Sequence, residues 1–122
     1  MSKKKILIID DEQSYVEVLK ERLEFERFEV MVALDGKTGL KLLAKNKYEA
    51  VLLDVMMPGF DGFEVKQYIN EKNGFLSHSP IIFVSAYGRS LSEEQKQIVG
   101  KSPFIRKPFE VKDLIKLINE QK

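Results

Sequence analysis

The sequence predicts a doubly wound α/β fold, in which a five-stranded parallel sheet lies between two layers of helices. Two observations predict it. Short apolar runs of strand length alternate along the whole chain with segments of helical spacing, and each run ends in polar or turn residues. Short connections with right-handed crossovers then make the strands parallel. The predicted strands cover residues 6–9, 30–33, 51–53, 81–84 and 104–106.

The strands are predicted from continuous apolar runs, because parallel strands are buried on both faces. The first run is Ile6-Leu7-Ile8-Ile9, and the run at 81–84 is the most hydrophobic of the set. The central run, Val51-Leu52-Leu53, leads into Asp54 and then into a Pro-Gly turn. Asp54 is therefore predicted at the carboxyl end of a strand, where open α/β sheets form their binding crevice.

Helices are expected between these strands from apolar spacing and from start signals. Capping boxes predict that the first helix begins near Ser14, with Glu17, and that the fourth covers residues 90–99, with Ser90 and Glu93. The second is expected over residues 37–45, where Gly39 should weaken it. The third should lie between Asp61-Gly62 and Asn73-Gly74, and the last has the clearest pattern, with Val111, Leu114, Ile115 and Ile118.

Length and composition narrow the classes of protein. A chain of 122 residues without cysteine corresponds to one domain, has no disulfide or thiolate metal site, and fits a reducing compartment. Its Lys+Arg count of 20 against an Asp+Glu count of 19 argues against a broad nucleic-acid surface. The apolar run after the basic start is too short for a signal peptide or a membrane span. We expect a soluble, cytoplasmic, single domain over residues 1–122, with no output domain and no direct nucleic-acid or membrane binding.

Polar side chains follow four of the predicted strands at the point where each ends. They are Asp10 and Asp11, Asp54, Ser85 and Lys107. The carboxyl ends of parallel strands share one edge of the sheet, so these groups should lie close together. Neighbouring carboxylates repel one another unless a cation joins them, and oxygen ligands without His or Cys favour Mg²⁺. A lysine ammonium and a serine hydroxyl can both bind phosphoryl oxygens. Together, these residues are therefore suited to phosphoryl transfer to a carboxylate nucleophile.

Each of these residues also has an ordinary structural interpretation. Asp54 could cap the turn that follows its strand, and Asp10 and Asp11 could cap the first helix. Ser85 could be a turn hydroxyl, and Lys107 could be a solvated lysine beside a proline. All of them fall at strand ends, and this joint placement favours a single site. The only histidine, His78, lies among small polar residues and is expected to be exposed, without a functional role.

The motifs resemble the receiver domain of two-component response regulators over essentially the whole chain. The residues that carry the resemblance are Asp10-Asp11-Glu12, the segment 53–59 with Asp61-Gly62, Val84-Ser85-Ala86 and Lys107-Pro108-Phe109. The resemblance implies a flavodoxin-like fold with strand order 2-1-3-4-5. It also implies a phosphoprotein of two-component or phosphorelay signal transduction.

The resemblance further implies a role for each site residue. Asp54 would accept a phosphoryl group from a phosphohistidine of a sensor histidine kinase or a histidine phosphotransfer protein, forming an aspartyl phosphate. Lys107 and Ser85 would contact that group. Magnesium would be held by Asp11 and Asp54, by Asp10 through water, and by the backbone carbonyl of Met56.

A conformational switch is implied as well. Ser85 would move toward the phosphoryl group, Phe104 would swing inward, and the surface of the fourth helix, fifth strand and fifth helix would bind a downstream protein target. Ser85 replaces the frequent Thr of the family, and Phe104 stands where Tyr is common. The Lys107-Pro108 bond would be cis. Met56 and Tyr87 are expected to restrict the attacking water and so to slow the loss of phosphate.

Other functions remain open on the sequence. The leading interpretation is a stand-alone receiver, not an enzyme acting on other substrates, that catalyses its own phosphoryl transfer and autodephosphorylation. One alternative is a receiver domain excised from a longer response regulator or hybrid histidine kinase. An aspartyl phosphatase would need a second acid two residues after Asp54, where Met56 stands, and a degenerate scaffold should lack the intact acidic set.

Overall fold

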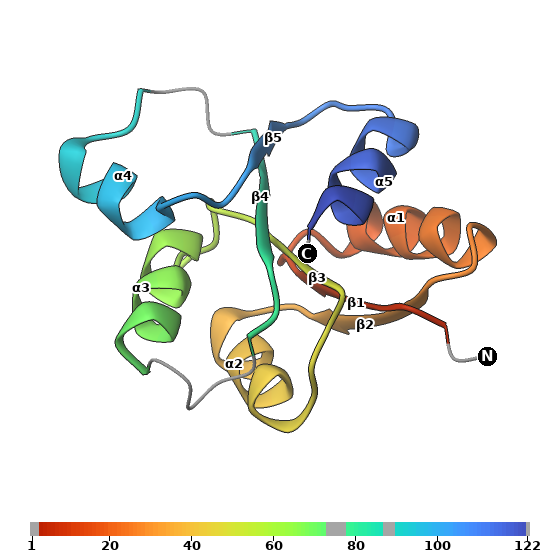
Figure 1. Cartoon of the computed structure of the whole chain (residues 1–122), viewed down its shortest axis with the longest axis horizontal. Helices are drawn as coiled ribbons and strands as arrows, with labels where there is room; N and C mark the ends of the chain where they lie inside the picture. Colours follow the sequence, from red (N-terminus) through yellow and green to blue (C-terminus); the bar gives the residue numbers. More distant parts are fainter. Residues whose placement is uncertain (1–2, 73–77, 87–89, 122) are drawn as a thin grey trace.

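Five parallel strands form one sheet in the order β2-β1-β3-β4-β5 (Figure 1). In this computed structural model, which describes residues 3–72, 78–86 and 90–121, the strands are β1 (Lys5–Ile9), β2 (Glu29–Ala33), β3 (Ala50–Leu53), β4 (Ile81–Ser85) and β5 (Phe104–Arg106). Every neighbouring pair is parallel. The predicted fold class and strand order are confirmed.

Five helices cover the two faces of this sheet (Figure 1). Helices α1 (Gln13–Phe25) and α5 (Val111–Glu120) lie together on one face, while α2 (Gly36–Lys45), α3 (Gly62–Lys72) and α4 (Glu93–Val99) lie on the other. None of the helices within the described ranges has the length and apolar content that a membrane crossing requires.

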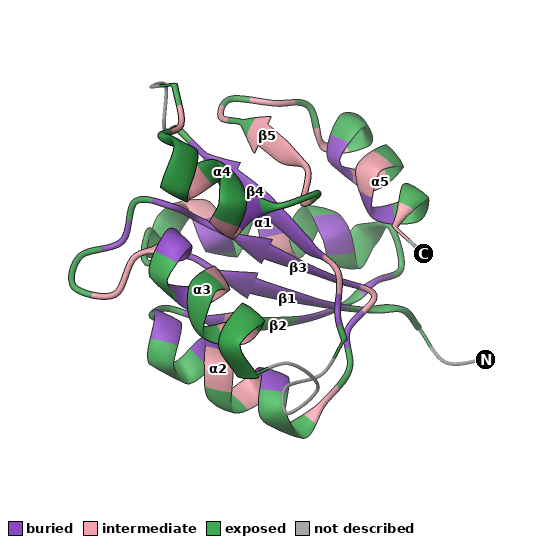
Figure 2. Cartoon of the chain, turned by 60° about the vertical axis from the view of Figure 1, so that its left-hand side comes forward, coloured by how far each residue is buried: buried purple, intermediate pink, exposed green. Residues whose placement is uncertain are grey.

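Each face of the sheet has its own hydrophobic core, because successive strand residues point to opposite sides. On β1, Leu7 and Ile9 pack beneath α2 and α3, whereas Ile6 and Ile8 pack against α1 and α5. Every residue of β3 and β4 is buried. Figure 2 shows these central strands as the buried centre of the molecule, and β5, at the edge of the sheet, as only partly covered.

Gly39 has a packing role that its helix propensity does not reveal. A Cβ atom at this position would lie 2.5 Å from Cδ1 of Ile9 and 2.8 Å from its Cγ1. The missing side chain therefore lets α2 approach β1 closely. The lower helix propensity of glycine is offset by this contact with the sheet.

Both predicted capping boxes are wrong in position. Helix α1 begins at Gln13 without a side-chain cap, so Ser14 lies inside its first turn. At α4 the N-cap is Ser92, whose hydroxyl accepts from the backbone N–H of Gln95 at 3.1 Å while the Gln95 side chain accepts from the backbone N–H of Ser92 at 2.9 Å. The backbone N–H groups of Ser92 and Gln95 thus both have acceptors, so the capping box lies at 92–95. Ser90 lies outside the helix.

The starts of α2 and α3 are fixed by aspartates. Asp35 is the N-cap of α2, and its Oδ1 accepts from the backbone N–H of Thr38 at 2.7 Å. Asp61, directly before α3, and Glu64, in its first turn, exchange two bonds from backbone N–H groups to side-chain oxygens, at 2.9 and 3.0 Å. The predicted end of α3 at Asn73-Gly74 lies outside the described residues.

Candidate functional site

Three carboxylates meet at the carboxyl edge of the sheet. Ile9 pairs with Leu53 in the ladder between β1 and β3, so the residues that follow, Asp10 and Asp54, leave the sheet side by side. Oxygen atoms of Asp10, Asp11 and Asp54 lie within 4.8 Å of one another. Asp10 and Asp54 are buried, whereas Asp11 is exposed. The structure therefore brings together the acidic residues that the sequence placed at two strand ends.

Lys107 directly follows the edge strand β5, and its side chain reaches into this cluster. Its backbone N–H donates to the Ser85 carbonyl, which fixes the start of the loop after β5. The ammonium Nζ lies 2.9 Å from Oδ2 of Asp10 and 3.8 Å from Oε1 of Glu12. Only 14% of the Lys107 side chain is exposed. Lys107 therefore pairs with Asp10 in this structure and balances part of the negative charge.

Asp54 is held in an environment that disfavours its charge. Burial raises the pKa of its carboxyl, and the neighbouring Asp10 carboxylate raises it further. Three groups oppose the rise: the Lys107 ammonium, the backbone N–H of Met56, which donates to Oδ1 at 3.3 Å, and a hydrogen bond from Ser85. The carboxyl is thus oriented by hydrogen bonds and destabilised by a like charge, an arrangement that a bound cation would relieve.

The backbone behind Asp54 depends on Gly62 at the start of α3. A Cβ atom there would lie 2.7 Å from Cα of Val55 and closer still to the backbone carbonyl oxygen of Asp54. The Gly62 N–H also donates to the Val55 carbonyl at 3.0 Å. Glycine thus allows α3 to pack directly against the turn that carries Asp54. The sequence places Gly62 at the start of the third helix and in the family motif, but does not reveal this close contact.

The cluster opens to solvent through a pocket. It is lined by Asp11, Glu12, Asp54, Met56, Ala86 and Lys107. Met56 is 59% exposed and lines this pocket together with Asp54, while its effect on the attacking water stays a prediction. Tyr87, the second residue expected there, lies outside the described residues. That the Met56 carbonyl is a metal ligand stays a prediction.

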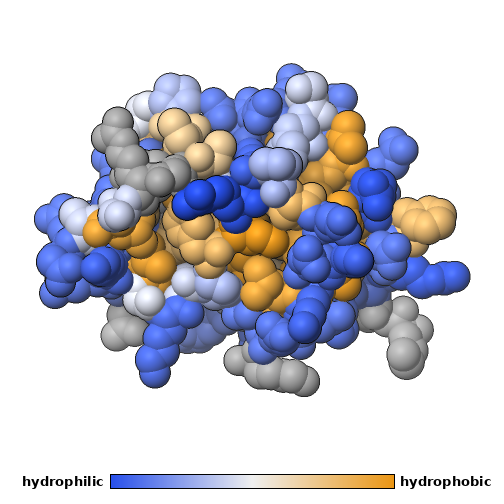
Figure 3. Space-filling view, turned by 90° about the horizontal axis from the view of Figure 1, so that it is seen from above, coloured by the Kyte–Doolittle hydropathy of each residue, from blue (hydrophilic) through white to orange (hydrophobic). Residues whose placement is uncertain are grey.

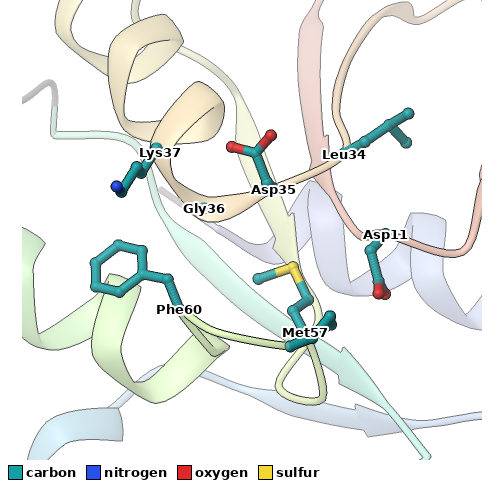
Figure 4. A pocket seen from close by; sticks show the side chains of 8 residues that line it. Asp11, Leu34, Asp35, Gly36, Lys37, Met57 and Phe60 are labelled. Atoms are coloured by element: carbon teal, nitrogen blue, oxygen red, sulfur yellow. The ribbon is translucent and has the colours of Figure 1, made fainter.

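A second, more apolar pocket adjoins the first and shares Asp11 with it (Figure 4). Met57 and Phe60, from the loop after β3, face residues 34–37, which join β2 to α2. The rim of the acidic site is therefore partly hydrophobic on the side of α2 and α3.

The two predicted switch residues occupy different environments. Ser85, at the end of β4, is completely buried and bonds to Asp54. Phe104, on β5, is half-buried and stacks on Phe83, with ring centroids 5.7 Å apart and planes 17° apart. The Lys107-Pro108 peptide bond is cis, as predicted, and His78 is exposed.

Two residues at the site were not assigned a role from the sequence. Glu12 lines the pocket, and its Oε1 lies 3.8 Å from Lys107 Nζ. The sequence indicates Glu12 only as part of an acidic motif. The Tyr15 ring lies under the Lys107 ammonium, with Nζ 4.0 Å from its centroid. Its place in the first turn of α1, directly after the acidic motif, was the available signal.

The acidic cluster fits a magnesium ion. All its donors are carboxylate oxygens, which Mg²⁺ prefers, and the three aspartates are close enough to share one cation. Asp11 faces solvent, so water could complete the octahedral shell that Mg²⁺ requires. A cation would also relieve the repulsion between Asp10 and Asp54.

Comparison with known proteins identifies the family. The model of the response regulator receiver domain matches residues 6–119. The uncharacterized transcriptional regulatory protein YkoG of Bacillus subtilis is 34% identical over 94% of this chain and 49% of its own length. The probable transcriptional regulator ycf27 of Galdieria sulphuraria is 39% identical over 92% of this chain and 42% of its own length. The chain thus spans about half or less of these relatives.

Solved structures agree with this result. The Thermotoga maritima response regulator TrrA, solved in complex with Mg²⁺ and BeF, has a TM-score of 0.82 and 31% identity, covering 98% of this chain and 99% of that one. The Vibrio cholerae chemotaxis protein CheY4 has a TM-score of 0.85 at 24% identity, covering 99% of this chain and 100% of that one, and supports the fold alone. Receiver domains bind Mg²⁺ at an acidic pocket, and this chain has such a pocket. The chain belongs to the response regulator receiver domain family.

Proposed function

We propose that Asp54 is the residue that accepts a phosphoryl group, in the presence of Mg²⁺, from a phosphohistidine of a sensor histidine kinase or a histidine phosphotransfer protein. Receiver domains of response regulators are phosphorylated by kinases, and this chain is such a domain. The observation that carries the assignment is the cluster of Asp10, Asp11 and Asp54 at an open pocket that also contains Lys107.

Asp54 is the best-placed nucleophile of the three aspartates. Asp10 is engaged by Lys107 at 2.9 Å, and Asp11 is exposed at the rim. The Asp54 carboxyl is buried but lines the pocket, and hydrogen bonds from Met56 and Ser85 orient it. In the proposed reaction an Asp54 oxygen forms a bond to phosphorus while the bond from phosphorus to the histidine nitrogen breaks, and the imidazole leaves with the electron pair.

Asp10, Asp11, Asp54 and the Met56 carbonyl would hold the Mg²⁺ ion. When bound, the ion supplies positive charge that stabilises the phosphoryl oxygens. Lys107 provides the second positive charge, because its ammonium lies at the mouth of the same pocket and can exchange Asp10 for a phosphoryl oxygen. Ser85 provides a hydroxyl donor from the buried end of β4.

The signal is proposed to leave the site through Ser85 and Phe104. Movement of Ser85 toward a phosphoryl group would open space near β4, and Phe104 is adjacent because it stacks on Phe83 of that strand. The surface formed by α4, β5 and α5 would then bind the downstream protein target. Figure 3, viewed from the side on which these elements lie in Figure 1, shows hydrophobic surface at the centre of the face, bordered by hydrophilic side chains.

The same residues argue against a hydrolase. A phosphatase of the aspartyl-phosphate type needs a proton donor two residues after its nucleophile, and Met56 cannot donate a proton. We therefore propose a signalling receiver that acts on no other substrate and loses its phosphate by autodephosphorylation. The site chemistry is the same for a stand-alone receiver and for one excised from a longer response regulator or hybrid kinase, and the length of the natural gene distinguishes them.

Phosphoryl uptake tests the proposal directly. Wild type, Asp54→Asn and the surface control Glu21→Gln are incubated with acetyl phosphate, and also with a phosphorylated histidine phosphotransfer protein, and each intact protein is weighed. We expect wild type and the control to gain one phosphoryl group in Mg²⁺, and to gain none with EDTA. Asp54→Asn should gain none. Equal uptake by Asp54→Asn would show that another residue is the acceptor.

A further inference from the structure

The Lys107 ammonium has a partner that carries no charge. Its Nζ lies over the face of the Tyr15 ring, 4.0 Å from the centroid, well within the range of a cation–π interaction. The two residues come from distant parts of the chain, since Tyr15 lies in the first turn of α1 and Lys107 follows β5. Asp10 and Tyr15 thus hold one ammonium group between them.

We propose that Tyr15 is a positioning residue that holds the Lys107 ammonium over the pocket for phosphoryl transfer to Asp54. The inference rests on the proposed function of Asp54 and Lys107. A lysine side chain is long and flexible, so a lysine that must meet a phosphoryl oxygen gains from being held in place before the group arrives. The face of the Tyr15 ring contacts the ammonium and restricts its position.

Charge explains why a ring suits this position better than another carboxylate. Asp10 is also proposed to help hold the Mg²⁺ ion, so an ammonium that depended on Asp10 alone would share its only partner with the metal. Glu12, 63% exposed and 3.8 Å from Nζ, would draw the ammonium outward. An aromatic face attracts the cation without adding a negative charge beside a cluster of three aspartates.

The surroundings of Tyr15 keep the ring neutral and in place. A phenol is neutral near pH 7 even at its ordinary pKa of 10.0, and here burial, followed by the carboxylates of Asp10, Asp54 and Glu12, raises the pKa further. The ring packs against the core on the side of α1 and α5. Its hydroxyl is buried and has no hydrogen-bond partner within the described part of the chain. The ring, and not the hydroxyl, is therefore the group that acts on Lys107.

A spectroscopic measurement tests the contact itself. Protons on the carbon next to the Lys107 nitrogen lie near the ring face, so the ring current should shift their NMR signals upfield. We expect this shift in wild type and in Tyr15→Phe, and we expect its loss in Tyr15→Leu. The signals of Lys112, which is 79% exposed and pairs with Glu110, serve as the internal control. Unshifted Lys107 signals in wild type would overturn the proposal.

Phosphorylation kinetics test the role. With acetyl phosphate and Mg²⁺, we expect Tyr15→Phe to keep the wild-type rate and Tyr15→Leu to lose about three- to tenfold. In a Lys107→Ala background, Tyr15→Leu should cause no further loss, because the ring acts through the ammonium. A site-specific trifluorinated phenylalanine at position 15 keeps the shape of the ring but removes its negative face, and should behave as Tyr15→Leu does even where the leucine variant folds poorly.

The possible results separate this inference from the function on which it rests. Phosphoryl uptake by wild type with an unchanged rate in Tyr15→Leu and in the fluorinated protein overturns the role of Tyr15 alone. An equal loss with and without Lys107 also overturns it, because Tyr15 would then act on the fold. A wild type that takes up no phosphoryl group overturns the proposed function and this inference with it, although the NMR measurement still reports the contact.

Discussion

Replacing Asp54 with asparagine should stabilise the metal-free protein even though it removes the proposed phosphoacceptor. The substitution keeps the shape of the side chain and removes one of three carboxylates that lie within 4.8 Å of one another. We expect the free energy of unfolding to rise by about 1 kcal/mol near neutral pH. The residue most important for function would then be a source of instability in the resting protein.

The magnitude follows from the charges around Asp54. Two unit charges 4.8 Å apart repel by about 3.5 kcal/mol at an effective dielectric constant of about 20. Lys107 offsets much of the effect of Asp10, because it pairs with that residue at 2.9 Å, and Asp11 is exposed and screened. Asparagine would also weaken the hydrogen bonds from Met56 and Ser85, which contribute about 1 kcal/mol each. Asparagine also removes the cost of burying a charge, which is the largest cause of the raised Asp54 pKa, and we therefore expect a net gain of about 1 kcal/mol.

The effect has a defined pH dependence. The pKa of Asp54 is raised in the folded protein, chiefly by burial and then by Asp10, so the folded state holds this proton more tightly than the unfolded state. The contribution of Asp54 to the free energy of unfolding is therefore most favourable below 3.8, the pKa of an unperturbed aspartate in the unfolded chain. This contribution is lost as the pH rises through the higher pKa of the folded state. The advantage of Asp54→Asn should be greatest near neutral pH and should shrink as the pH falls toward 3.8.

Urea unfolding followed by circular dichroism, with EDTA present and over a pH series, measures this advantage. Glu21→Gln, an exposed substitution in the middle of α1, controls for the loss of one negative charge. Added Mg²⁺ should stabilise wild type more than Asp54→Asn, since the variant lacks one ligand. Asp54→Asn that is no more stable than wild type near neutral pH, or whose advantage persists in acid, would refute the electrostatic account of the site.

Three further predictions test other parts of the structure. Met56→Asn should give severalfold faster loss of phosphate from the phosphorylated protein, because the exposed Met56 borders the approach of water to Asp54; an unchanged rate would contradict this role. Ser92→Ala should lower the free energy of unfolding by about 1 kcal/mol, and Ser90→Ala should leave it within about 0.5 kcal/mol, with similar losses refuting the observed cap. Gly39→Ala should destabilise by about 1 kcal/mol, since overpacking of about 1–3 kcal/mol against Ile9 exceeds the gain of about 1 kcal/mol in helix propensity. Adding Ile9→Val removes the closest atom, so the double variant should be more stable than the sum of the single changes predicts, whereas strict additivity would show that the two sites do not touch.

The sequence by itself determined the architecture and most of the site. Continuous apolar runs such as Ile6-Leu7-Ile8-Ile9 can be satisfied only where both faces of a strand are covered, which requires helices on each side. Parallel strands share one carboxyl edge, so the sequence alone places Asp10, Asp54, Ser85 and Lys107 together. Both results depend on the periodicity of each segment and on the alternation of strands and helices, which can be read along the chain.

Only the tertiary structure decided which of several equivalent local signals is used. Ser90 and Ser92 are each followed, three residues later, by a Glu or Gln that could complete a capping box. In the folded chain the capping box forms at Ser92. The lower helix propensity of Gly39 could be read locally, but its reason is the approach of Ile9 from another element.

The sequence placed Lys107 near Asp10 but did not predict its contact with Tyr15. Its ammonium pairs with Asp10 and lies over Tyr15, both from the start of the chain. Local patterns specify what a segment can form, because they act through hydrogen bonds and periodicity within a few residues. The contacts that choose among those possibilities join residues far apart in sequence, and only the folded chain brings them within a few ångströms of one another.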